Sequence, residues 1–110
     1  MSEFAVIYQG FIKEGSEDTY KACWNKIAQY FIASRGAIGS CLHKVEDGSW
    51  LAYSRWPDKE TRDQSWPGED EIAQSLPDEI VEAIKGLKAC IDHSKPFTET
   101  CMQLVEDYLV

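Results

Sequence analysis

The chain of 110 residues predicts an α+β fold of the ferredoxin-like type, with a four-stranded antiparallel sheet. Apolar positions alternate between strand and helix periodicity in the order β-α-β-β-α-β. An Asp47-Gly48 pair between two strand-like segments marks a hairpin. Residues 1–110 are long enough for one core and too few for two, so a single domain is expected. Right-handed crossovers then place both long helices on one face of the sheet.

The first strand is expected over residues 4–12, where large apolar groups occur on both faces. Gly15 and Ser16 end it, and Ser16 can cap the helix that follows. Arg35 and Gly36 supply the C-terminal stop of that helix. Its apolar face repeats at helical spacing and consists of Tyr20, Cys23, Trp24, Ile27 and Phe31.

The hairpin register follows from the turn. Asp47-Gly48 suits a two-residue type I′ turn, in which both residues adopt positive φ. That turn places His43 opposite Ala52. One face then carries Cys41, His43, Val45, Trp50, Ser54 and Trp56, and the other Ile38, Leu42, Lys44, Leu51, Tyr53 and Arg55. We expect the face with His43 and Trp50 to line a pocket and the other face to pack against the helices.

The C-terminal half continues with two helices and a strand. Pro57-Asp58 opens a short helix over residues 59–66, which Pro67-Gly68 interrupts. A longer helix follows Pro77 and ends near residues 94–96, and a last strand spans residues 98–105. The longer helix has one apolar stripe, formed by Ile80, Val81, Ile84, Leu87 and Ile91.

Charge and cysteine usage exclude several classes. Eleven basic and nineteen acidic side chains give a net charge of −8 without a basic patch, so neither nucleic acid nor an anionic membrane is an expected partner. No export signal or membrane span is recognisable, which predicts a cytoplasmic protein. The cysteines lie in four different expected elements without a C-x-x-C pair, so buried free thiols and no metal site are expected: Cys23, Cys41, Cys90 and Cys101.

Two helices cover only one face of a sheet, yet the strands carry large apolar groups on both faces. An uncovered patch of that size is unusual for a soluble monomer. The sequence therefore predicts a homodimer whose two sheets pack face to face into a barrel.

Residues 39–60, read as G-S-C-L-H-K-V-E-D-G-S-W-L-A-Y-S-R-W-P-D-K-E, resemble the antibiotic biosynthesis monooxygenase-like domains of the dimeric α+β barrel superfamily. Tyr53, Ser54, Arg55 and Trp56 take the places of an aromatic-acidic-arginine-tryptophan pattern, and Asp58 takes the place of the following cap. The resemblance implies a dimer with a pocket in each subunit between sheet and helices. Some members oxygenate phenolic or quinol-type aromatics without metal or flavin, and others degrade haem.

Two departures bear on chemistry. Ser54 stands where family members often have an acidic residue, so proton transfer at that position is in doubt. The haem-degrading branch uses a first-strand asparagine, a tryptophan and a later histidine. Trp66 can stand for the tryptophan, but Gln9 is the only amide in the first strand and no histidine occurs between Trp66 and His93. Haem degradation is therefore disfavoured.

A cofactor-free oxygenase must hold an electron-rich aromatic, help it lose a proton and stabilise the resulting anion. His43 as a titratable group and Arg55 as a permanent cation are the candidate catalytic residues. Candidate pocket walls are Trp24, Trp50, Tyr53, Trp56 and Trp66. Each also has a structural interpretation: the aromatics as core or interface, His43 as a hydrogen-bonded structural residue, and Arg55 paired with Glu60 or Asp63.

The functional hypothesis is a cofactor-independent monooxygenase acting on a small aromatic or quinone-like compound. The alternative is a non-catalytic dimeric barrel that binds a small hydrophobic ligand. Ser54 and the lack of a positioned base favour the alternative on chemistry, whereas the resemblance favours the enzyme. The candidate site residues depend on which face of the hairpin lines the pocket.

Overall fold

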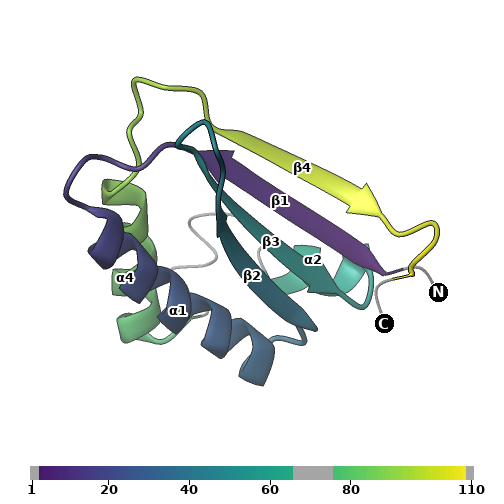
Figure 1. Cartoon of the computed structure of the whole chain (residues 1–110). Coiled ribbons are helices and arrows are strands. Elements are labelled where there is room, and N and C mark those ends of the chain that lie inside the picture. Colours follow the sequence, from purple (N-terminus) through teal and green to yellow (C-terminus); the bar gives the residue numbers. More distant parts are fainter. Residues whose placement is uncertain (1–2, 66–75, 109–110) are drawn as a thin grey trace.

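The computed structural model describes residues 3–65 and 76–108. Its elements follow the predicted β-α-β-β-α-β order, and the short helix predicted after the third strand is present as well (Figure 1). They are β1 (Phe4–Gly10), α1 (Glu17–Ser34), β2 (Gly39–Lys44), β3 (Trp50–Trp56), α2 (Lys59–Ser65), α4 (Asp78–Ala89) and β4 (Thr98–Gln103).

The four strands form one antiparallel sheet in the order β2-β3-β1-β4, which confirms the ferredoxin-like prediction. Helices α1 and α4 lie side by side against one face, called here the helix face (Figure 1). The opposite face is called the outer face. Side chains from β1, β3, α1 and α4 form the main core: Phe4, Val6, Phe31, Trp56, Ile80 and Ile84.

The loop between β2 and β3 differs from the predicted type I′ turn. Val45 N–H donates to the Ser49 carbonyl at 2.8 Å, and Gly48 N–H donates to the Val45 carbonyl at 3.0 Å. Gly48 has a φ of 90°, whereas no non-glycine residue among those described has a positive φ, so Asp47 does not meet the type I′ requirement. The loop therefore has three residues, 46–48, with the geometry of a type I turn followed by a glycine bulge.

This loop shifts the hairpin register by one residue. Leu42 pairs with Ala52 and His43 with Leu51, so the predicted pairing of His43 with Ala52 is wrong. Because side chains alternate along a strand, the shift exchanges the two faces of β2. Leu42 and Trp50 pack on the helix side with Tyr20, whereas His43 lies on the outer face. The expectation that His43 and Trp50 share a face is therefore wrong, and so is the expectation that Leu42 and Leu51 share one.

Several ends of elements also differ from expectation. β1 stops at Gly10, and Ile12 instead forms an isolated bridge with Ile91. α4 ends at Ala89 because the chain turns there: Asp92 N–H donates to the Phe11 carbonyl at 2.8 Å. β4 ends at Gln103 rather than at residue 105.

The capping predictions have mixed outcomes. The Asp58 carboxylate accepts a hydrogen bond from Thr61 N–H at 2.7 Å, which confirms it as the cap of α2. Ser16 is the N-cap residue of α1, as predicted, but its side chain makes no capping hydrogen bond. Gly36 has a φ of 84° directly after the C-terminal cap residue Arg35, as the stop signal predicts.

All four cysteines are free thiols, but burial was predicted for each and holds only for Cys90. Cys23 is half-buried, and Cys41 and Cys101 are exposed because they lie on the edge strands β2 and β4. None of the helices in the described ranges has the length and hydropathy needed to cross a bilayer.

Proline substitutions distinguish the three-residue loop from the predicted type I′ turn. In the three-residue loop Glu46 is the first central position of a type I turn, so we expect Glu46→Pro to be tolerated or to stabilise by about 0.4–1 kcal/mol. Asp47→Pro should lower the urea midpoint, because proline is disfavoured at the second central position and the Asp47 side-chain bonds to Ser49 are lost.

In the type I′ register, Glu46 N–H would bond across the hairpin and Glu46→Pro would be the damaging variant. A clear loss of stability in Glu46→Pro would thus contradict the loop described above.

Candidate functional site

The structure does not bring the predicted site residues together. His43 is exposed and Arg55 half-buried on the outer face, whereas Trp50 and Trp56 point toward the helices.

Trp56 is buried edge-on against Phe31, with ring centroids 6.2 Å apart. Trp50 packs edge-on against Tyr20 of α1, Trp24 is half-buried on α1, and Tyr53 is half-buried on the outer face. Trp66 lies outside the described residues. A common pocket of His43 and the tryptophans is not formed by these positions.

Arg55 lies in a hollow of about 290 Å³ on the outer face, beside Tyr53 and Met102. Its Nε is 3.3 Å from a Glu3 carboxylate oxygen, and its Nη1 donates to Asp107 at 3.2 Å. The predicted partners Glu60 and Asp63 are therefore wrong. Tyr53 and the two carboxylates raise the pKa of Arg55, so the group is a permanent cation that ties the C-terminal segment to the sheet.

A second polar cluster lies on the helix face, where β1, α2 and β4 meet. Arg62 Nη2 donates to Tyr8 Oη at 3.0 Å and to Glu99 Oε1 at 2.7 Å, while Arg62 Nη1 donates to Asp63 at 3.3 Å. The Arg62 side chain is only 13% exposed. We call Tyr8, Arg62 and Glu99 the Tyr8–Arg62 cluster.

An aromatic wall borders this cluster. The ring of Phe97 stacks on Tyr8 with centroids 6.2 Å apart and an interplanar angle of 27°. Phe97 can occupy this place because residue 10 is glycine: a Cβ there would lie 2.4 Å from the ring. The Phe97 side chain is 45% exposed, which is unusual for phenylalanine and leaves an accessible flat apolar surface beside a phenol and a cation.

The electrostatics of the cluster are set by burial and by Arg62. Burial raises the pKa of Tyr8 although the Arg62 hydrogen bond opposes it, so the phenol is protonated at neutral pH. Burial alone would lower the pKa of Arg62, but the hydrogen bonds to Glu99 and Tyr8 outweigh it and raise that pKa. Burial also raises the pKa of the neighbouring Cys101 thiol, whose Sγ donates to Glu99 at 3.6 Å. The cluster thus combines a fixed cation, its Glu99 counter-ion and a neutral phenol, and the neutral Cys101 thiol lies next to it.

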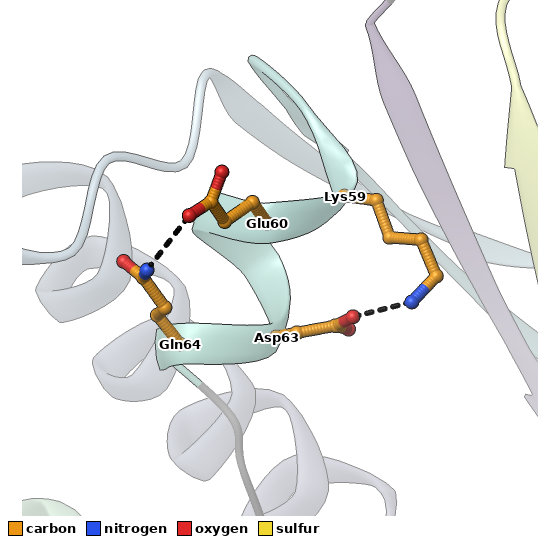
Figure 2. A pocket seen from close by; sticks show the side chains of 4 residues that line it. All are labelled: Lys59, Glu60, Asp63 and Gln64. Carbon is orange, nitrogen blue, oxygen red and sulfur yellow. Dashed lines mark hydrogen bonds and ion pairs between the residues drawn. The ribbon is translucent and has the colours of Figure 1, made fainter.

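Helix α2 also borders a wide, open hollow of about 580 Å³ (Figure 2). Its lining among the described residues consists of Lys59, Glu60, Asp63 and Gln64. Lys59 pairs with Asp63, and Gln64 donates to Glu60 at 3.3 Å. Asp63 also accepts from Arg62, so one residue joins this hollow to the Tyr8–Arg62 cluster.

The arrangement suits a flat aromatic ligand with an ionised oxygen. Phe97 and Tyr8 provide apolar surface, and the Tyr8 hydroxyl and Arg62 provide two donors for an oxyanion. The cluster contains no histidine, because His43 is on the outer face and His93 lies after α4, where its Nε2 is 3.1 Å from the Lys88 carbonyl oxygen. In the described ranges, no group of three potential metal ligands occurs.

Sequence reasoning missed this cluster. The alternation of β1 does place Tyr8 on the same face as Phe4 and Val6, so its orientation was predictable. Arg62 and Glu99 gave no signal, since their contact joins positions 37 residues apart.

No protein-family model and no curated protein matches the chain. Solved structures do match. SnoaB from Streptomyces nogalater, described as a cofactor-independent oxygenase, aligns over 100% of both chains with a TM-score of 0.68 and 13% identity. The chain has the same α+β fold as this oxygenase.

Two further structures agree. A candidate antibiotic biosynthesis monooxygenase from Bordetella bronchiseptica aligns over 96% of this chain and 100% of its own, with a TM-score of 0.69 and 18% identity. Rv0793 from Mycobacterium tuberculosis aligns over 97% of this chain and 99% of its own, with a TM-score of 0.69 and 15% identity. The predicted resemblance is thus confirmed at the level of the monooxygenase-like fold.

Gly10→Ala tests how the aromatic wall is held. The new methyl group would displace the exposed Phe97 ring from Tyr8, because a side chain yields more easily than backbone. We expect loss of nuclear Overhauser contacts between the two rings, with a change in unfolding free energy below about 1 kcal/mol. Gly39→Ala is the matched control, since nothing lies within 4 Å of its Cβ position. Retained ring contacts in Gly10→Ala would refute this role of Gly10.

Proposed function

We propose that the protein is a cofactor-independent monooxygenase for a small aromatic or quinone-like compound, and that the substrate binds at the Tyr8–Arg62 cluster. One observation carries the proposal: a largely buried guanidinium and a protonated phenol lie beside an exposed aromatic wall on the helix face. The fold shared with SnoaB, a cofactor-independent oxygenase, supports it.

The chemistry assigned to the site is stabilisation of a substrate anion. Hydrogen bonds from Arg62 and Tyr8 to a substrate phenolate lower the pKa of the substrate, so its proton can pass to water. The electron-rich anion then reduces O₂. One oxygen atom enters the product at the activated carbon, and the other leaves as water with two hydrogens from the substrate, so no external reductant is needed.

A second candidate function is a non-catalytic barrel that binds a small hydrophobic ligand. The observation favouring it is the composition of the cluster, whose phenol and thiol both have raised pKa values and whose cation is already paired with Glu99. Such a site binds an aromatic compound without assisting proton transfer.

Oxygen uptake with 1,4-dihydroxynaphthalene separates these candidates. If the proposal holds, Tyr8→Phe and Arg62→Gln should each reduce uptake at least about tenfold, the effect of one lost oxyanion donor being of that order or larger. Lys85→Gln is the matched control, an exposed helical cation paired with Glu82.

His43→Ala and Arg55→Ala decide between the two faces of the sheet, since both residues were predicted to be catalytic. Loss of uptake in these two variants, with Tyr8→Phe unchanged, would move the chemistry to the outer face. Saturable binding without uptake in any variant would favour the non-catalytic barrel.

We also propose that two copies of the chain pack outer face to outer face. None of the described helices covers this face (Figure 1), where Ile7 pairs with Tyr53 and Ala5 with Met102. Beyond β4, Val105 is 89% exposed. A second copy would cover these apolar groups.

Ile7→Asp should convert this dimer to a monomer, because burying an unpaired carboxylate in the interface is unfavourable. Light scattering coupled to size exclusion gives the mass, and Ile32→Asp is the control because Ile32 is exposed on α1. A monomeric unaltered protein at micromolar concentration, or a dimer that survives Ile7→Asp, would contradict the proposed interface.

A further inference from the structure

We infer that Arg62 and Tyr8 select aromatic compounds bearing a carboxylate, and that the Glu99 side chain occupies the carboxylate position until such a ligand displaces it. The inference rests on the proposed function of the same site and names its substrate class. It assigns Glu99 a role as an internal competitor that sets specificity.

The geometry joins the phenol and one carboxylate oxygen through a single guanidinium nitrogen. A single nitrogen, Arg62 Nη2, reaches both Tyr8 Oη and Glu99 Oε1, at 3.0 and 2.7 Å. The phenol accepts from Arg62, so its own proton remains available to a neighbouring acceptor. A ligand carboxylate that takes the Glu99 position would keep the Arg62 donor, and its second oxygen, if turned toward Tyr8, would also receive the phenol proton.

The two partners of the ion pair differ in how easily they move. Glu99 is on the edge strand β4 and its side chain is 44% exposed, so it can turn into water at little cost. Arg62 is 13% exposed, and its guanidinium cannot be rehydrated as fully when Glu99 leaves. Asp63 stays 3.3 Å from Nη1, but the Nη2 side of this largely buried cation would lose its counter-ion, so a second anion in place of Glu99 is favoured.

The aromatic wall determines which anion fits. Phe97 stacks on Tyr8 and remains 45% exposed, so a planar ring can lie against it while its carboxylate reaches Arg62. A neutral phenol gains the ring contact but cannot replace Glu99 as a counter-ion. The net charge of −8 repels anions at long range, yet salt screens charges beyond roughly 8 Å. The affinity for an anionic ligand is therefore set by its pairing with Arg62.

The test measures binding of 1-hydroxy-2-naphthoate and of its neutral counterpart 1-naphthol by calorimetry. The unaltered protein should bind the acid more tightly. Glu99→Gln should strengthen binding of the acid by about tenfold, since removal of one competing charge is worth about one charge-assisted hydrogen bond. Binding of 1-naphthol should change less than about twofold. Arg62→Gln should abolish the preference for the acid, and Arg62→Lys should restore part of it.

Glu106→Gln is the matched control, because it removes an exposed carboxylate outside the cluster. Equal affinity of the unaltered protein for both compounds, or unchanged acid binding in Glu99→Gln, would overturn the inference. Oxygen uptake without acid preference would refute this inference but leave the proposed function standing. Acid preference with the expected Glu99→Gln effect but no uptake would support the site and refute the enzyme.

Discussion

The three-residue loop between β2 and β3 determines which side chains of the hairpin meet the helices. Asp47 accepts hydrogen bonds from Ser49 N–H at 2.8 Å and from Ser49 Oγ at 2.6 Å, which lowers the pKa of Asp47. Ser49 is 1% exposed, and its Oγ also accepts from Gln9 Nε2 at 3.0 Å. The loop is thereby fixed to β1, and with it the register that directs Trp50 and Trp56 into the core.

The candidate site depends on this core without being part of it. Packing of Phe4, Val6 and Trp56 against the helices holds β1 and β3 in place, so Tyr8 projects from a rigid strand. Arg62 comes from a short helix that starts at the Asp58 cap, and its guanidinium joins that helix to two strands. One side chain thus serves both as the attachment of α2 and as the cation of the site.

The order of elements and the helix positions were readable from the sequence because they follow from local periodicity and from caps such as Asp58. The hairpin register could not be read from the sequence, since Asp47-Gly48 fits both a type I′ turn and a type I turn with a glycine bulge. Long-range contacts such as the Gln9–Ser49 hydrogen bond select between the two turns. The Tyr8–Arg62 contact joins residues 54 positions apart, a pairing to which no local pattern points. Catalytic roles for His43 and Arg55 stay predictions, now attached to the outer face.

Because β4 is an exposed edge strand, the part of the site that it carries is expected to open at a lower free energy than the rest of the fold. β4 is bonded only to β1, and all of its residues except Met102 are exposed, so peeling it away removes far less buried surface than global unfolding does. Glu99 and its neighbour Phe97 would leave with that strand, whereas Tyr8 and Arg62 remain anchored on β1 and α2. Local opening would therefore be confined to this sheet edge, while the hydrophobic interior stays closed to water.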